Sequence, residues 1–279
     1  MKIKKVSAPV RVDFGGGTTD ISPFYSRYGG AVLNCSIQKY VVGELVSGDK
    51  KTSLKYEADV PTSSGLGTSG AMTLVWLALI TKEKDKGKLC EWVYNISQAR
   101  ELFDDGKQDQ YAAAYGGINF MEFSRKGVVK VSPVKISKKV LGELESKLVL
   151  VYSGKPHYSG DTNGMAIRNL KSGRALKHFK RVKEIAYEMR DALVGGDLSR
   201  FGELMNEETL ERAQFAKGIV PPKIWKLIKD GKKNGAEAAK VCGSGGGGSI
   251  LFYGDVGKLK RFFGKRIIDF RFDNLGIRG

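Results

Sequence analysis

The chain has 279 residues, which is enough for about two domains of roughly 100–200 residues each and for a sizeable buried core. Its 47 Lys and Arg against 30 Asp and Glu give a formal charge of +17, which would suit nucleic acid, an acidic membrane surface or a polyanionic small molecule without choosing among them. Three scattered cysteines without C-x-x-C spacing and only two histidines argue against a disulfide framework, a thiolate or histidine-rich metal site, and serine–histidine hydrolysis.

The first part of the sequence predicts a strand-rich opening followed by three helices. Residues 2–55 alternate short β-branched runs with glycine turns, except in DISPFYSRYGG, where Asp20 or Ser22 would cap a short helix that ends at Gly29-Gly30. Apolar periodicity then predicts a buried helix over 70–82, an amphipathic helix over 89–103 and a third helix over 108–115. The run MTLVWLALI is shorter than the about 18 residues of a membrane span, and MKIKKVSAPV lacks a signal peptide's apolar stretch, so we expect a cytoplasmic protein.

The second part predicts a hairpin and then alternating helices and strands. INFMEFS and GVVKVSPVKI form a hairpin around Arg125-Lys126, and KLVLVYSG opens a second half, so we place a soft domain boundary between residues 146 and 147. The densest basic stretch, residues 168–190, has helical periodicity and is best explained as the solvated face of one helix. Helices near 202–217, 221–235 and 256–266 and strands at 249–255 and 267–273 complete the prediction.

The loop PTSSGLGTSGA, residues 61–71, precedes the buried helix and is rich in glycine and hydroxyl side chains. It contains G-x-G-x-x-G, but no strand leads directly into it as a dinucleotide fold requires, and no lysine follows Gly70 as in a Walker loop. Glycines let backbone N–H groups approach an anion, and the start of a helix favours negative charge there. The loop therefore suits a polyphosphate, although a loop that only caps the helix would look the same.

Three further segments carry candidate residues, each with a simpler structural explanation. KVCGSGGGGSILFY, residues 240–253, is read either as a tight turn with exposed backbone or as a flexible linker. In APVRVDFGGGTTD, residues 8–20, Arg11 would ordinarily form a surface ion pair and Asp20 would cap a helix. In GKQDQYAAAYGG, residues 106–117, Asp109 would ordinarily be a solvated helix residue, but the small alanines beside it allow close packing.

Together, in this order, the four segments resemble the GHMP kinases, the family of galactokinase, homoserine kinase, mevalonate kinase and phosphomevalonate kinase. The central motif of that family reads P-x-x-x-G-L-G-S-S-A, and Pro61 and the segment from Gly65 to Gly70 occupy its positions, with Thr68 in place of the first serine and Gly70 in place of the alanine. The other three segments, with the terminal IIDFRFDNLGI, are most similar to the sugar 1-kinases related to D-glycero-D-manno-heptose 7-phosphate kinase. The similarity extends over nearly the whole chain.

This resemblance implies an α+β chain of two domains with the active site in the cleft between them. Residues 1–146 would form an amino-terminal α/β domain with a left-handed β-α-β crossover that binds ATP, and residues 147–279 a ferredoxin-like α+β domain. The phosphates of ATP would be bound by one loop, which comprises Ser64, Gly65, Leu66, Gly67, Thr68, Ser69 and Gly70. Gly245, Gly246 and Gly247 would form the opposite wall near the transferred phosphate.

The resemblance also implies roles for residues at the acceptor. Asp109 matches the aspartate that orients or deprotonates the acceptor hydroxyl, and Arg11 matches the basic residue beside it. Such an arginine would keep the carboxylate ionised and share the charge of the transferring phosphoryl group. The sugar hydroxyls would be contacted by a single segment, through Asp20, Thr18 and the backbone around Gly16 and Gly17.

The metal and the acceptor are where the sequence departs from the family. We expect Mg²⁺ at Ser69 and Glu101, but the segment between Glu101 and Gly106 is shorter than in heptose kinases, and Asp104 or Asp105 would then serve instead. The chain is also shorter than those enzymes, so the loops that select the substrate differ. We hypothesise that a second phosphate on the sugar binds basic residues after KLVLVYSG, namely Lys155, His157, Arg168 and Lys171.

The sequence thus predicts a magnesium-dependent kinase that transfers phosphate from ATP to a hydroxyl of a sugar or sugar phosphate, as a monomer or homodimer. One alternative is a kinase of a non-sugar alcohol such as mevalonate, phosphomevalonate or an amino acid. Another is a basic nucleic-acid-binding protein on an inactive kinase fold, for which FYSRY and KLKRFF offer the only basic aromatic candidates. We expect neither nucleic acid nor a membrane as a partner.

Overall fold

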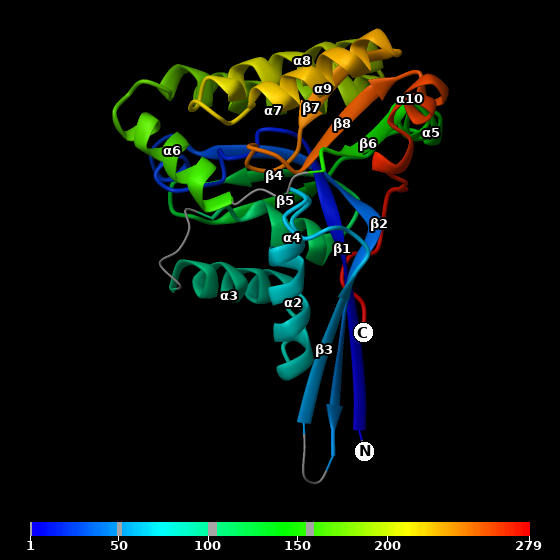
Figure 1. The fold of residues 1–279 in the computed structure, drawn as a ribbon. Coiled ribbons are helices and arrows are strands. Elements are labelled where there is room, and N and C mark those ends of the chain that lie inside the picture. Colours follow the sequence, from blue (N-terminus) through cyan, green and yellow to red (C-terminus); the bar gives the residue numbers. More distant parts are fainter. Residues whose placement is uncertain (1, 49–51, 100–104, 155–158) are drawn as a thin grey trace.

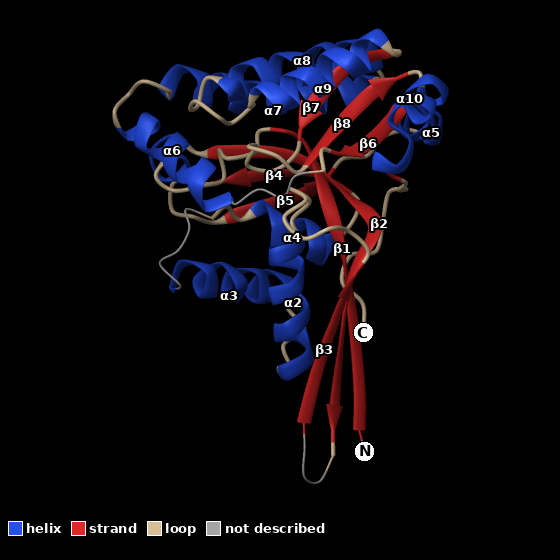
Figure 2. Cartoon of the chain, in the orientation of Figure 1, coloured by secondary structure: helices blue, strands red, loops and turns tan. Residues whose placement is uncertain are grey.

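The structure is a computed structural model, in which residues 2–48, 52–99, 105–154 and 159–279 are described. Two antiparallel sheets are packed with helices, and a group of long helices covers one side of the molecule (Figure 1). Figure 2 shows helices and strands in both halves of the chain, and in the described part of the chain helices follow one another without an intervening strand from residue 68 to 115 and from residue 159 to 233. Within the described residues, no helix combines the length and the apolar character needed to cross a bilayer.

The first sheet is built around one long central strand. β2 (Gly30–Ser47) pairs with β1 (Lys2–Gly15), with β3 (Thr52–Ala58) and with β4 (Ile118–Phe123), and β4 pairs with β5 (Val129–Pro133). The side chains of β1 are exposed over its first four residues and almost wholly buried from Ala8 onward. The outer ends of β1, β2 and β3 therefore project as a ribbon, and the inner ends lie in the core (Figure 1).

Two helices of the first half pack on β1 and β2, and a third packs on those two helices. α1 (Phe24–Tyr28) is short, α2 (Thr68–Ile80) is apolar on nearly all sides, and α3 (Lys86–Ala99) and α4 (Gln108–Tyr115) lie beside it. α2 begins two residues earlier than periodicity predicts because Gly67, with φ of +75°, ends the loop in a left-handed conformation. α4 has the bounds that the sequence predicts, ending at Gly116 with φ of +70°.

The second sheet has the strand order β7-β8-β6-β9 and carries its own helices. Its strands are β6 (Leu148–Tyr152), β7 (Ala236–Val241), β8 (Ser249–Gly254) and the short β9 (Ile267–Ile268). The helices of this half are α5 (Lys138–Lys147), α6 (Ser159–Lys171), α7 (Leu176–Gly195), α8 (Leu198–Ala213), α9 (Pro222–Lys233), α10 (Val256–Phe263) and the 3₁₀ turn η1 (Gly264–Arg266).

The two halves pack together through two hydrophobic clusters, each of which contains residues of both halves. α7 packs on β1 and β2, and Phe14 on β1 meets Phe201 on α8 edge to face, with ring centroids 5.3 Å apart. The end of the chain also returns to the first sheet, where Phe272 pairs with Ile37 and Arg278 with Ser7. The boundary between residues 146 and 147 separates the two sheets and stays a prediction as a domain boundary.

Three sequence-based predictions of local structure are wrong. The basic stretch 168–190 is not one helix, because the chain breaks between α6 and α7 at Gly173, whose φ is +80°. α1 is capped by neither Asp20 nor Ser22: its first flanking residue is Pro23, and no side-chain cap bond forms. The terminal strand is limited to β9, and α5, with Ser137 accepting from the Val140 amide as its cap, has no counterpart among the predicted helices.

The core can be tested on α2. Leu74 is fully buried there and Met72 on the same helix is 41% exposed. We expect Leu74→Ala to lower the free energy of unfolding by about 2–5 kcal/mol, because the cavity left behind cannot collapse fully. Met72→Ala should change it by less than about 1 kcal/mol. The measurement is urea unfolding followed by circular dichroism, and equal effects of the two substitutions would contradict the packing described for α2.

Candidate active site

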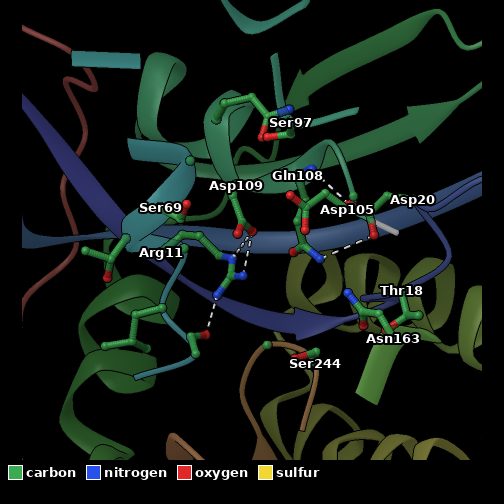
Figure 3. Close-up of a pocket in the computed structure, with 18 of the residues that line it drawn as sticks. Arg11, Thr18, Asp20, Ser69, Ser97, Asp105, Gln108, Asp109, Asn163 and Ser244 are labelled. Atoms are coloured by element: carbon green, nitrogen blue, oxygen red, sulfur yellow. Dashed lines mark hydrogen bonds and ion pairs between the residues drawn. The ribbon is translucent and has the colours of Figure 1, made fainter. Parts of the chain in front are cut away.

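A cavity of about 320 Å³ lies where the inner end of β1 meets the starts of α2 and α4. Figure 3 shows side chains from distant parts of the sequence directed into it. It brings together most of the predicted site residues, namely Arg11, Thr18, Asp20, Asp109 and the whole segment 64–70. The other lining residues are Ile21, Ser63, Ser97, Asp105, Gly106, Gln108, Gln110, Asn163, Gly243 and Ser244.

Arg11 joins the segment 61–71 to the start of α4. Its Nε and Nη2 both donate to Oδ1 of Asp109, at 2.8 and 2.5 Å, and its Nη1 donates to the carbonyl of Gly65 at 2.6 Å. The Arg11 side chain is 5% exposed and that of Asp109 is 31% exposed, so the carboxylate reaches the cavity while the guanidinium lies behind it. Although burial alone would lower the pKa of Arg11, the Asp109 and Asp13 carboxylates hold it above its usual value.

The segment 61–71 has the backbone geometry of an anion-binding loop. Gly65 and Gly67 have φ of +77° and +75°, and the free amides at the start of α2 follow directly. The buried hydroxyls of Ser64 and Thr68 have no hydrogen-bond partner among the described residues. Buried polar groups are normally paired, so these two hydroxyls are consistent with a polar ligand that the loop awaits.

Two of these glycines are required by Asp109 itself. A Cβ at Gly67 would lie 3.1 Å from Cγ of Asp109, and a Cβ at Gly70 would lie 2.8 Å from its Cβ. Any larger residue would push the carboxylate and the loop apart. The glycines therefore allow the segment 61–71 and the start of α2 to approach α4 closely. They also leave the backbone of the loop accessible to a ligand, as the sequence indicated.

Asp20 is not a cap for α1 but a partner of α4. Its Oδ2 accepts from the backbone amide of Gln108 at 2.9 Å, at the start of that helix, and it is 1% exposed. A Cβ at Gly106 would lie 2.1 Å from Oδ2, so only glycine permits this approach. Burial raises the pKa of Asp20 to about 6, opposed by the Gln108 amide and helped by the charge of Asp109.

The glycine run of the second half meets the segment 61–71 through its first member. A Cβ at Gly243 would lie 2.8 Å from the carbonyl oxygen of Gly65, and Gly243 and Ser244 line the cavity. Gly245, Gly246 and Gly247 do not line it: Gly245 packs on the Ile219 carbonyl, and the Gly246 amide donates to that carbonyl at 2.7 Å. Gly16 and Gly17 also lie outside the lining, the former against the Ala31 carbonyl.

Beneath the cavity, four buried charges link the two halves of the chain. Lys240 on β7 donates to Oδ2 of Asp13 on β1 at 2.8 Å, and Arg212 on α8 donates to Glu208 at 2.6 and 2.9 Å. Lys240 also lies 3.5 Å from Glu208, and Arg212 lies 3.4 Å from Asp13. Although burial alone would raise the pKa of Asp13, the Lys240 and Arg212 charges hold it below its usual value.

This charge cluster, Asp13, Glu208, Arg212 and Lys240, also holds two walls of the cavity. Nη1 of Arg212 donates to Oγ1 of Thr18 at 3.2 Å and to the Gly243 carbonyl at 2.9 Å, while the Gly243 amide donates to Asp13 at 3.0 Å. Thr18 has a φ of +72°, an unfavourable conformation for a β-branched residue. Its position therefore depends on being held by Arg212.

Several functional candidates escaped the sequence analysis. Gln108 lines the cavity, but the motif around it was interpreted only through its neighbour Asp109. Ser97 on α3 and Asn163 on α6 also line the cavity, and no sequence pattern indicates a role for either. The predicted metal ligand Glu101 falls outside the described residues, as do Asp104, Lys155 and His157. Arg168 and Lys171 are on α6 and do not line the cavity.

The donors available for a metal ion are few. No cluster of three or more His, Cys, Asp or Glu side chains occurs in the described part of the chain. Ser69 and Asp105 line the cavity, and they add a hydroxyl and a carboxylate to the carboxylates of Asp20 and Asp109. Mg²⁺ commonly takes one or two carboxylates and completes its coordination with substrate phosphates and water, which fits this set.

The three cysteines lie in the protein core. Cys35, Cys90 and Cys242 are all buried and unpaired as disulfides. Burial raises the pKa of Cys242 to about 12. They are therefore packed, unreactive thiols.

Comparison with protein families finds two matching models. Residues 33–117 match the GHMP kinases N terminal domain and residues 189–262 match the GHMP kinases C terminal model, and together these ranges are more than half of the chain. They contain segment 61–71, Asp109 and the charge cluster except Asp13.

Among characterised relatives, the chain is 27% identical to D-glycero-alpha-D-manno-heptose 7-phosphate kinase of Campylobacter jejuni over 92% of this chain and 91% of that protein. It is 28% identical to glucuronokinase 1 of Arabidopsis thaliana, over 70% of this chain and 55% of that protein. A solved D-glycero-D-manno-heptose 1-phosphate kinase from Bacteroides thetaiotaomicron has a TM-score of 0.79 at 23% identity, covering 99% of this chain and 98% of that one. The predicted two-domain fold of mixed helix and sheet is confirmed by this likeness.

The charge cluster can be tested through Lys240. Lys240→Met leaves the buried carboxylates of Asp13 and Glu208 with Arg212 as their remaining cation, so we expect the free energy of unfolding to fall by about 3–5 kcal/mol. The matched control is Lys258→Met, whose side chain is 62% exposed beside Asp255 and should change stability by less than about 1 kcal/mol. Guanidinium unfolding gives both values. A small loss at Lys240 would show that the cluster does not join the halves.

Proposed function

Because the chain belongs to the GHMP kinase family, we propose that it transfers the γ-phosphoryl group of ATP to a hydroxyl group of a sugar or sugar phosphate. The observation that carries the proposal is the Arg11–Asp109 pair. It places a partly exposed carboxylate at the same cavity as the amides at the start of α2 (Figure 3). A nucleotide phosphate and an acceptor hydroxyl would thus share one small space.

The segment 64–70 would hold the phosphates of ATP. Its left-handed glycines expose main-chain N–H groups, the start of α2 favours negative charge, and the orphaned hydroxyls of Ser64 and Thr68 supply further donors. Bound Mg²⁺ would offset the charge of the phosphates, with Ser69 and Asp105 as its protein ligands.

Asp109 would orient the acceptor hydroxyl and take its proton. Both bonds from Arg11 go to Oδ1, so Oδ2 is the oxygen left to face the acceptor. Arg11 also donates to the Gly65 carbonyl, so the same guanidinium fixes the carboxylate relative to the segment 61–71. Phosphoryl transfer depends mainly on such positioning and on charge, and this arrangement supplies both.

The acceptor side supports a polyhydroxylated substrate. Asp20, Thr18, Gln108, Asn163 and Ser97 line the cavity beside Asp109, and all can form hydrogen bonds with hydroxyl groups. The relatives named as heptose-phosphate kinase and glucuronokinase agree with a sugar acceptor. Mevalonate kinases are also similar, at 22% identity for that of Methanothermobacter thermautotrophicus, but no feature of the cavity favours a non-sugar alcohol.

The proposed function is tested by ADP release in the presence of ATP and Mg²⁺ with a panel of free sugars, sugar phosphates and small alcohols. Phosphorus NMR of the product then identifies the hydroxyl that has reacted. We expect turnover with a sugar or a sugar phosphate. Turnover confined to a non-sugar alcohol, or none with any acceptor, would overturn the proposal.

The role of Asp109 predicts a selective loss of kcat. Asp109→Asn keeps an oxygen for Arg11 but removes the proton acceptor, so we expect kcat to fall by roughly 10²–10⁴-fold while KM for ATP changes little. Asp230→Asn, which breaks a surface pair with Lys226, is the matched control and should leave kcat unchanged. Steady-state kinetics measures both, and near-normal turnover by the Asp109→Asn protein would remove this carboxylate from the mechanism.

Asp20 predicts a pH dependence of acceptor binding. Since burial raises its pKa to about 6, the carboxylate loses its charge as the pH falls through 6, and one hydrogen-bond acceptor for the sugar becomes a donor. The charged and titratable groups that influence Asp20 or are influenced by it are Asp109, Arg11, Arg212 and Tyr94.

We therefore expect kcat/KM for the acceptor to decline below pH 6, and this decline to be absent in Asp20→Asn, whose activity is lower but flat through that range. The pH profile of both proteins is the measurement. An identical profile for both would assign the titration to another group.

A further inference from the structure

Gln108 is the first residue of α4 and lies between the two acids of the cavity. Its backbone amide donates to Oδ2 of Asp20 at 2.9 Å, and its side-chain Nε2 lies 3.5 Å from Oδ1 of the same carboxylate. The residue is 5% exposed and lines the cavity. Figure 3 shows Gln108 beside Asp20 and Asp109, with dashed contacts to Asp20.

The orientation of the Gln108 amide is set by two neighbours. Nε2 faces the Asp20 carboxylate, and it would lie 3.3 Å from a Cβ at Gly17, so the nitrogen points at the cavity wall. Turning the amide over would bring Oε1 against an ionised carboxylate, two acceptors without a proton between them. While Asp20 is ionised, Oε1 is therefore the free end of the side chain.

Oε1 of Gln108 is buried and has no hydrogen-bond donor among the described residues. Leaving such an acceptor unpaired is costly, and unpaired buried groups in native structures call for an explanation. A purely structural amide would be expected to satisfy both ends within the protein. Here one end is fixed to Asp20, and the other remains for a ligand in the cavity.

We propose that Gln108 determines acceptor specificity by receiving a hydrogen bond, at Oε1, from a sugar hydroxyl adjacent to the one that contacts Asp20. This inference rests on the proposed function. In this arrangement Asp20 orients the Gln108 amide, and the amide oxygen accepts the hydrogen bond from the neighbouring hydroxyl. The acceptor is therefore a compound with two adjacent hydroxyl groups beside the one that is phosphorylated, and an analogue that lacks the hydroxyl facing Gln108 is rejected because Oε1 is left unpaired.

The experiment removes the hydrogen bond from each side in turn. Gln108→Met keeps the length of the side chain without its polar end. D-galactose and D-glycero-D-manno-heptose 7-phosphate, each with its series of monodeoxy analogues, are the acceptors. For whichever acceptor the native protein turns over, we expect one deoxy analogue to lose about 10- to 100-fold in kcat/KM, and Gln108→Met to show a similar loss with the parent sugar.

The decisive result is the combination of the two changes. We expect Gln108→Met to treat the parent sugar and that deoxy analogue nearly alike, because each change removes the same bond. KM for ATP should stay constant, since Gln108 is not part of the segment 61–71. The exposed Gln214→Met is the matched control and should retain the discrimination of the native protein. Thermal unfolding of all three proteins separates loss of recognition from loss of fold.

Failure of this inference is distinguishable from failure of the proposed function. If neither sugar nor any other polyhydroxylated acceptor supports ADP release by the native protein, the proposed function falls and this inference with it. Suppose instead that the native protein turns over a sugar, and that each deoxy analogue lowers kcat/KM by the same factor in Gln108→Met as in the native protein. That result overturns the role of Gln108 alone. If Gln108→Met unfolds at a much lower temperature than the native protein, Gln108→Asn takes its place, and its affinity for the acceptor is measured by calorimetric titration. An affinity equal to that of the native protein also overturns the role of Gln108.

Discussion

The charge cluster of Asp13, Glu208, Arg212 and Lys240 is the interaction on which the arrangement of the cavity depends. Its members come from β1, α8 and β7, and each is almost wholly buried. Buried charges persist only when they are paired, so strands of the two sheets cannot separate without exposing an unpaired charge to the core. Because Arg212 also bonds to Thr18 and to Gly243, the cluster that joins the halves sets the width of the cavity between them.

What could be predicted from the sequence is what short segments encode locally. The glycines of the segment 61–71, the apolar run of α2 and the glycine stop after α4 predict their elements because each acts within a few residues. Taken singly, Arg11, Asp20 and Asp109 had ordinary structural explanations, and the family resemblance assigned them to one site; the structure brings them to one cavity. The break at Gly173 was missed because amphipathic periodicity continues on both sides of it, and only the turn geometry distinguishes two helices from one.

What could not be predicted depends on contacts between distant residues. In the sequence, Lys240 and Arg212 look like ordinary surface cations. Nothing in the neighbouring residues indicates that both are buried against acidic side chains, or that one of these acids lies on β1. Gly243 and Ser244 were passed over for the glycines that follow, since a run of four glycines gives no hint of which ones face inward. Gln108 has meaning only once Asp20 is placed beside it, and these positions are 88 residues apart.

The return of the chain end to the first sheet has a consequence for how the protein is made. Ser7 on β1 and Ile37 on β2 obtain Arg278 and Phe272 as partners, so residues far apart in the sequence pair within the first sheet. During synthesis these partners emerge from the ribosome well after the strands that they pair with, and so does α7, which covers the same sheet. The nascent amino-terminal half would thus leave apolar strand surface uncovered until α7 and the segment of Phe272 and Arg278 have been made, and chaperones act on exposed surface of this kind.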